Sequence, residues 1–243
     1  MVRHRRHLQQ GPALRRMCRA NAIAEYAQVT GRTFVTEYYT IRGCGSGIYE
    51  EKKSRFIGQA FPVTTHEEIR EILSKVRGKY YDARHHCYAY VLGADRMDRK
   101  ASDDGEPSGT AGLPILKVLD GAMAANVLVV VTRYFGGTLL GTGGLTRAYT
   151  EAAKAAVADA GLSRMREGEV LTLTMDYALL DQVSYLLKQK GIAGTDLEYT
   201  DRVSMKITVP LAETGEIRKA LEGAGYGRLV ITSSGRGYFG FPE

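Results

Sequence analysis

Residues 132–149 read TRYFGGTLLGTGGLTRAY, a run that predicts a strand, a glycine-rich loop and a helix in succession. The preceding residues, Val127 to Thr132, are apolar and branched, which is typical of a buried β-strand. Beyond the glycines, the stretch from Leu145 to Ala160 is rich in alanine and is followed by Gly161, which predicts a helix with a glycine at its end. A strand and a helix joined in this way indicate a domain that alternates the two kinds of element.

The chain before this unit continues the same pattern. Thr65 and Glu68 form a capping box, in which a hydroxyl and a carboxylate satisfy free backbone N–H groups at a helix start. The apolar residues behind it recur with helical spacing, at Ile69, Ile72, Leu73 and Val76. Gly78 can end this helix, and aromatic and branched residues predict flanking strands at 55–61 and 86–92.

The second half of the chain has a different order of elements. Leu171, Leu173 and Met175 alternate with polar residues, which indicates a strand with one buried face. The predicted elements are, in order, this strand, a helix around 179–187, strands at 195–200 and 202–209, a helix around 217–221 and a strand at 228–232. The order βαββαβ is that of the ferredoxin-like fold, and residues 161–168 are predicted to be the linker before it.

The charge of the chain is concentrated at its beginning. The net charge is +6, yet residues 1–35 hold seven basic residues against one acidic residue, and the remainder is balanced at 26 against 26. The folded body must therefore be judged on local patches. The tail could be a basic arm for RNA, a transit sequence or upstream reading frame translated from an early start, and we favour the last. We expect residues 1–35 to be disordered and dispensable.

The cysteine content and the hydropathy of the chain indicate the cellular compartment in which the protein is found. The three cysteines, Cys18, Cys44 and Cys87, form no CxxC pair and leave one cysteine over in any disulfide scheme, which favours a reducing compartment. The longest strongly apolar run, 127–131, is far shorter than the roughly 18 residues that a membrane helix needs. These features predict a cytoplasmic protein without a membrane span.

Four motifs together resemble the signature of the YigZ/IMPACT family. They are KKSRFIG at 52–58, HHCYAYVLG at 85–93, SDDGEPSGTAG at 102–112 and the glycine-rich run at 132–149. The resemblance covers essentially residues 36–243 and implies an α+β protein of two domains. A domain similar to the second domain of ribosomal protein S5 would occupy 36–163. A ferredoxin-like domain, similar to a C-terminal domain of the ribosomal translocase, would occupy 164–243.

The resemblance also implies a field of activity. The bacterial YigZ-like members suggest association with RNA or the ribosome. The eukaryotic relatives act in translational control by engaging a partner protein, and they lack the C-terminal domain predicted for this chain. A protein partner in translation control is therefore a further expectation.

The glycine-rich run predicts an anion site. Its glycines can expose backbone N–H groups just before a helix N-terminus, where partial positive charge favours anions: Gly136, Gly137, Gly141, Gly143 and Gly144. Arg147 is expected in the first turn of that helix, with Arg133 converging on the same place. Alternatively, Arg147 pairs with Glu151 or with the acidic loop, and no ligand is needed. The run lacks the lysine of a Walker loop, which disfavours nucleotide hydrolysis.

The acidic run at 102–112, which we call the signature loop, has two interpretations. Asp103, Asp104 and Glu106 could hold a magnesium ion with a substrate phosphate. We favour a rigid turn, in which Gly105, Pro107 and Gly109 set the backbone and the carboxylates bond to nearby amides. No metal or other cofactor is predicted.

The other polar motifs carry weaker signals. His85 and Cys87 should face one side of a strand and His86 the other, so neither a zinc site nor a nucleophilic cysteine is favoured, and Cys87 is expected to be buried. Lys53 and Arg55 belong to a basic and aromatic cluster with Tyr49, Lys52 and Phe56. Such a cluster can bind phosphates and stack on bases, or it can be an ordinary strand edge.

The sequence thus predicts a non-enzymatic binding protein associated with RNA or the ribosome, with a role in translation regulation. The contact would centre on Arg133, Arg147 and the glycine-rich loop. The alternative is an enzyme that acts on a small phosphorylated or acidic ligand through the signature loop, with His85 or His86 and the same anion site. A purely protein-binding regulator is a third class, which an exposed apolar patch would indicate.

Overall fold

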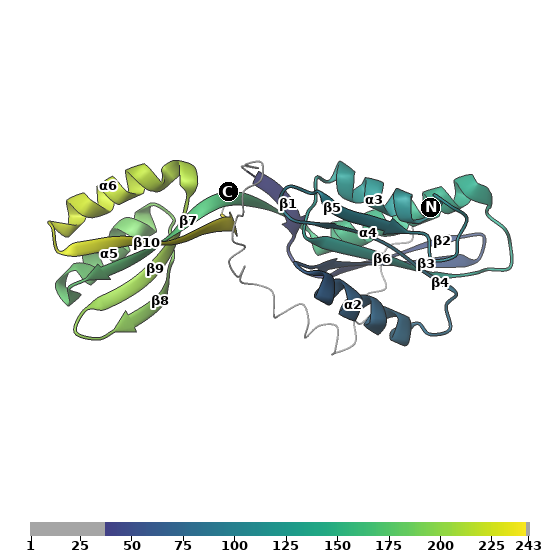
Figure 1. Cartoon of the computed structure of the whole chain (residues 1–243), viewed down its shortest axis with the longest axis horizontal. Helices are drawn as coiled ribbons and strands as arrows, with labels where there is room; N and C mark the ends of the chain where they lie inside the picture. The colour runs from purple at the N-terminus through teal and green to yellow at the C-terminus, as the bar shows by residue number, and fades with distance from the viewer. Residues whose placement is uncertain (1–36, 242–243) are drawn as a thin grey trace. The chain divides into compact units, whose positions relative to one another are not determined.

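The computed structural model describes residues 37–241, which fold as two compact units (Figure 1). The first unit comprises Tyr38–Arg164 and the second begins at Met165. Both combine helices with antiparallel sheets, so the predicted α+β class with two domains is confirmed. The basic tail predicted for residues 1–35 lies outside the described residues. Within 37–241, no helix has both the length and the apolar character needed to cross a bilayer.

The first unit is built on a five-stranded sheet in the order β2-β3-β6-β4-β5, with every neighbouring pair antiparallel. Its strands are β2 (Gly45–Glu51), β3 (Ser54–Pro62), β4 (His85–Leu92), β5 (Asp98–Ser102) and β6 (Val127–Tyr134). Figure 1 shows helix α2 (His66–Lys79) on one face and helices α3 (Gly112–Gly121) and α4 (Gly141–Ala160) on the other. Because side chains alternate along each strand, they point either to the α2 side or to the α4 side.

Helix α2 begins as the sequence predicts. The Thr65 hydroxyl accepts the N–H of Glu68 at 3.2 Å, and the Glu68 carboxylate accepts the N–H of Thr65 at 3.2 Å, which completes the capping box. The predicted apolar stripe is buried in one cluster with side chains of the sheet: Ile69, Ile72, Leu73 and Val76. The helix runs one residue beyond Gly78, to Lys79.

Helix α4 packs closely on strands β2 and β3 because glycines of the sheet face alanines of the helix. A Cβ at Gly58 would overlap the carbonyl group of Ala152. The alanine content that predicts the helix thus also allows its close approach. The helix begins at Gly141, earlier than the predicted start at Leu145. Its first turn is exposed and needs no apolar residue, so hydrophobic spacing alone could not locate it.

The second unit has the predicted βαββαβ order. Its elements are β7 (Leu162–Met175), α5 (Leu180–Gln189), β8 (Gly194–Tyr199), β9 (Val203–Pro210), α6 (Thr214–Gly225) and β10 (Leu229–Gly240). The strands lie in the order β10-β7-β9-β8, with antiparallel neighbours. Strand β1 (Glu37–Ile41), of which all but Glu37 belongs to the first unit, pairs with β7. Short 3-10 turns, Tyr177–Leu179 and Leu211–Glu213, precede the two helices. Both helices bury apolar side chains in one core with β7 and β9.

The boundary between the units, at Arg164 and Met165, falls within the linker predicted at 161–168, but this segment is not a loop, because strand β7 begins at Leu162. Strand β10 pairs with β7 from Leu229 opposite Met175 to Gly240 opposite Met165. Pairing with a partner strand overrides the local preference of glycine and charged residues for loops. For the same reason the last strand extends well beyond its predicted end at Thr232.

Candidate functional site

The signature loop is organised around the carboxylate of Asp103. Its oxygens accept the backbone N–H groups of Gly109, Ala111 and Gly112 at 2.8–3.0 Å. Burial alone would raise the pKa of Asp103, but these hydrogen bonds outweigh it and lower that pKa. The ionised carboxylate therefore fixes the backbone where helix α3 begins.

The turn geometry predicted for this loop is present. Gly105 and Gly109 have φ values of 86° and 76°, in the region that L side chains rarely adopt. The Thr110 hydroxyl donates to the carbonyl of Pro107 at 2.6 Å. These contacts favour the rigid turn over the magnesium site. Across residues 37–241, no group of three or more His, Cys, Asp or Glu side chains is arranged to hold a metal ion.

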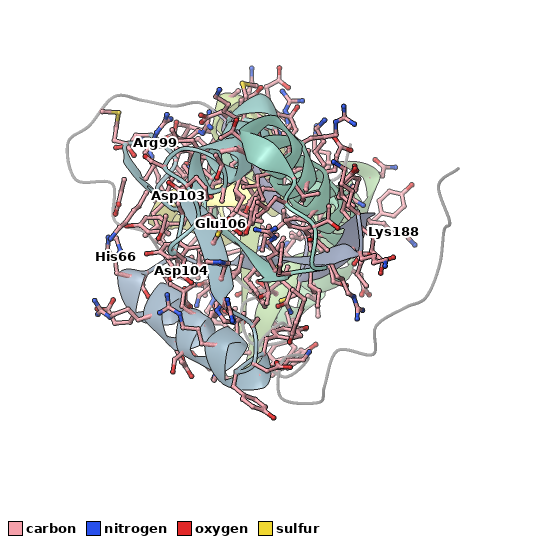
Figure 2. The ribbon with its side chains drawn as sticks, turned by 90° about the vertical axis from the view of Figure 1, so that its right-hand side faces the viewer. His66, Arg99, Asp103, Asp104, Glu106 and Lys188 are labelled. Atoms are coloured by element: carbon pink, nitrogen blue, oxygen red, sulfur yellow. The ribbon has the colours of Figure 1, made fainter. Side chains whose placement is uncertain are left out.

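Asp104 lies toward helix α2 (Figure 2). Its carboxylate accepts the backbone N–H of His86 at 2.7 Å and forms an ion pair with Arg77 at 3.1 Å. The ring of His86 is buried beside the carbonyl of Tyr80, at 3.2 Å, and burial lowers the pKa of His86. On the α4 side of the sheet, Nδ1 of His85 lies 2.9 Å from the carbonyl oxygen of Asp104. The adjacent histidines thus belong to opposite faces.

Glu106 joins the signature loop to the core on the α4 side. Only 3% of its side chain is exposed, and it accepts hydrogen bonds from Arg133 at 2.6 Å and from the Tyr149 hydroxyl at 2.9 Å. Arg133 itself is 7% exposed. The prediction that Arg133 converges with Arg147 on an external anion is therefore wrong. Its position in strand β6 points it beneath helix α4, where Glu106 already neutralises it.

Cys87 completes this buried polar network. Its thiol is fully buried and lies 2.9 Å from the carbonyl oxygen of Asp103 and 3.3 Å from the Tyr149 hydroxyl. Burial raises the pKa of Cys87 to about 12, and burial also raises the pKa of Tyr149. A thiol in this state is protonated at neutral pH and is a poor nucleophile. The cysteine has the buried position expected from the sequence.

The tip of the β2–β3 hairpin lies against the glycine-rich loop. Lys52 and Lys53 form a two-residue turn with φ values of 45° and 67°, and both are exposed. The N–H of Gly136 donates to the Ser54 hydroxyl at 3.0 Å, and a Cβ at Gly136 would overlap the backbone of Lys53. Glycine at this position therefore brings the hairpin lysines and the loop together.

Arg147 is exposed near the same hairpin. It lies in the second turn of α4, not in the first as predicted, because the helix begins at Gly141. Its positive charge acts on Tyr49: burial and a hydrogen bond to Glu51 raise the pKa of Tyr49, and Arg147 opposes them. Within residues 37–241, Arg147 has no carboxylate within ion-pair distance, and Glu151 pairs with Lys154 instead, at 3.1 Å.

The side chain of Arg55 lies on the other face of the sheet from Arg147. Its neighbour Phe56 packs against Tyr149 on the α4 side, with ring centroids 5.1 Å apart, so Arg55 points to the α2 side beside Tyr134. The other predicted glycines lie in the loop and the first turn of α4. Gly137 and Gly141 have positive φ values of 85° and 69°, and Gly141, Gly143 and Gly144 open the helix.

Sequence reasoning missed two apolar side chains of this loop. Phe135 is 54% exposed and Leu139 is 82% exposed. The guanidinium of Arg133 lies 5.5 Å from the centroid of the Phe135 ring. An aromatic residue directly before paired glycines was the available signal. We call the set Tyr49, Lys52, Lys53, Phe135 and Arg147 the basic surface.

A separate groove lies in the second unit, between helix α5 and strand β8. It has a volume of about 570 Å³, and most of its lining is apolar. Asp181 and Lys188 are its charged residues. None of the predicted site residues lies there.

Comparison with known families matches both units. The Impact N-terminal domain matches residues 52–157, and a domain of unknown function, DUF1949, matches residues 173–227. The chain is 35% identical over 177 residues to the IMPACT family member YvyE of Bacillus subtilis. The aligned residues cover 73% of this chain and 82% of that protein. It is 36% identical over 186 residues to the IMPACT family member YigZ of Escherichia coli. The aligned residues cover 76% of this chain and 91% of that protein.

A relative that matches a shorter part of the chain and a solved structure are also similar to this protein. The protein IMPACT homolog of Dictyostelium discoideum is 37% identical over 95 residues, which cover 37% of this chain and 27% of that protein. A crystal structure described as a hypothetical protein is 33% identical and has a TM-score of 0.54, over 82% of this chain and 97% of that one. The names of these relatives state no reaction.

Proposed function

The chain belongs to the IMPACT family, and from this premise we propose that it is a non-enzymatic protein that binds RNA or the ribosome and acts in translation regulation in the cytoplasm. The observation that carries the proposal is the basic surface. There, two hairpin lysines lie against the glycine-rich loop, and Arg147 stands without a carboxylate partner among the described residues.

The charges of this surface suit a phosphate backbone. Lys52 and Lys53 sit on a turn whose backbone is held by Gly136, so their positions are fixed while their ammonium groups remain in solvent. Cations presented in this way bind nucleic acid by displacing its counterions, and this binding needs no base recognition. Glu51 is engaged by the Tyr49 hydroxyl at 3.1 Å and offsets only part of the positive charge.

The buried network argues against the enzymatic alternative. Asp103 is held by backbone N–H groups, Asp104 by Arg77 and His86, and Glu106 by Arg133 and Tyr149. Each carboxylate of the signature loop therefore has a structural task. A small acidic or phosphorylated ligand would have to displace one of these contacts.

Binding to labelled RNA and co-sedimentation with ribosomes test the proposal. The triple variant Lys52→Ala, Lys53→Ala, Arg147→Ala should bind more weakly in both assays, and by a similar factor for RNAs of different sequence, because phosphate contacts carry no sequence information. The matched control removes three cations from helix α2 on the opposite face: Arg70→Ala, Lys75→Ala and Lys79→Ala. Equal losses of affinity in both variants, or no binding by the wild type, would contradict the proposal.

A further inference from the structure

Phe135 is an exposed aromatic ring of the basic surface, in the loop that lies against the hairpin lysines. More than half of the residue, 54%, is exposed, although the adjoining strand β6 is buried almost throughout. The residue is preceded by Arg133 and Tyr134 at the end of that strand and followed by Gly136, which lies against the hairpin lysines. Phe135 is therefore next in sequence to the glycine that contacts the backbone of the hairpin lysine Lys53.

The ring is held in place from its buried side. The Arg133 guanidinium lies 5.5 Å from the centroids of both Phe56 and Phe135, and Glu106 fixes that guanidinium through a 2.6 Å hydrogen bond. The residue after Phe135 is also held in place, because the N–H of Gly136 donates a hydrogen bond to the Ser54 hydroxyl at 3.0 Å. The backbone is thus tied down on both sides of Phe135, so little ordering is left for a ligand to impose.

The arrangement suits one class of nucleic acid. An aromatic ring flanked by cations stacks on a nucleobase while its neighbours bind the backbone, and this requires an unpaired base. Bases of an RNA duplex are stacked on one another and cannot reach an external ring. We propose that Phe135 is a stacking platform for one unpaired nucleobase, so that the basic surface binds single-stranded RNA in preference to duplex RNA. This inference rests on the proposed function.

The absence of tryptophan from the sequence allows a direct test. Phe135→Trp keeps a stacking ring and introduces a single indole fluorophore. The probes are a 12-nucleotide unstructured RNA and the same sequence within a fully paired duplex. We expect the single strand to quench the indole emission and the duplex to leave it unchanged. Phe135→Leu should weaken binding of the single strand by about tenfold or more. Leu139→Ala, on the same loop, should change that affinity less than about twofold.

The outcomes separate this inference from the proposed function. The stacking platform is wrong if Phe135→Leu binds the single strand as tightly as the wild type, or if the wild type binds the duplex as tightly as the single strand. RNA binding by the basic surface still holds in that case if the triple cation variant binds more weakly. If the wild type binds neither probe and does not co-sediment with ribosomes, the proposed function is wrong and the stacking platform is wrong with it. Equal melting temperatures of the Phe135→Leu variant and the wild type confirm that the comparison concerns binding alone.

Discussion

Arg133 and Glu106, which are 27 positions apart in the chain, form a buried ion pair at 2.6 Å between strand β6 and the signature loop. Their side chains are 7% and 3% exposed. The pair links the most distinctive acidic motif of the sequence to the start of the glycine-rich run. It holds the two motifs together through a direct contact between their side chains.

This pair should be essential to the stability of the first unit. Glu106→Gln leaves the Arg133 guanidinium buried without a counter-charge, and we expect a loss of about 3–5 kcal/mol in the free energy of unfolding. Arg133→Met should cost a similar amount. The double variant should be destabilised by less than the two single effects combined, because no unpaired charge remains. Urea denaturation of the wild type, the two single variants and the double variant measures this coupling. Additive changes in the free energy of unfolding would contradict the pairing.

The Asp103 carboxylate should contribute strongly to the same unit. Asp103→Ala removes the acceptor of three backbone N–H groups, and we expect a loss of about 3 kcal/mol in the free energy of unfolding. Asp95→Ala is a suitable control, because Asp95 accepts the Met97 N–H in an exposed turn, and it should cost below about 1 kcal/mol. Similar losses at the two positions would show that the signature loop is not organised around Asp103.

Mild acid should destabilise the protein through His86. Burial lowers its pKa in the folded state, so as the pH falls below about 6.5 the unfolded chain takes up the proton first and stability declines. His86→Gln removes this titration. The variant should therefore show a flatter dependence of unfolding free energy on pH between about 6.5 and 5. Parallel curves for the variant and the wild type would exclude His86 as the source.

Cys87 should be unreactive in the native protein. Burial raises its pKa to about 12, so at pH 8 almost no thiolate is present and alkylating reagents cannot reach the sulfur. Peptide mapping after iodoacetamide treatment should find Cys87 unmodified in buffer and modified in urea. Rapid native alkylation at Cys87 would revive the nucleophile hypothesis.

Local signals in the sequence predicted much of the fold. The Thr65 and Glu68 capping box and the alternation through Leu171, Leu173 and Met175 depend on near neighbours, and both are found as predicted. The start of α4 and the length of β10 were missed, because an exposed first turn and a paired strand need no local apolar pattern. Their boundaries depend on tertiary contacts instead.

The site was less predictable for a related reason. The sequence predicted one anion site for Arg133 and Arg147 and a separate basic cluster for Arg55. In the structure Arg133 is in a buried ion pair, Arg147 is exposed, and Arg55 points to the α2 side of the sheet. Which environment each one meets depends on strand alternation and on a carboxylate 27 positions away from Arg133. Phe135 stands directly before paired glycines, which was a local signal, but its 54% exposure depends on where the tertiary structure places the loop.

The salt dependence of RNA binding tests the central claim most directly. The logarithm of the affinity of the intact protein for a single-stranded RNA should fall linearly with the logarithm of salt concentration. Removing Lys52, Lys53 and Arg147 together should flatten that slope by about 2, because each cation that binds a phosphate of a single strand contributes about 0.7 to it. The helix α2 control variant should keep the wild-type slope. An unchanged slope in the basic-surface variant would contradict the claim that this surface holds RNA.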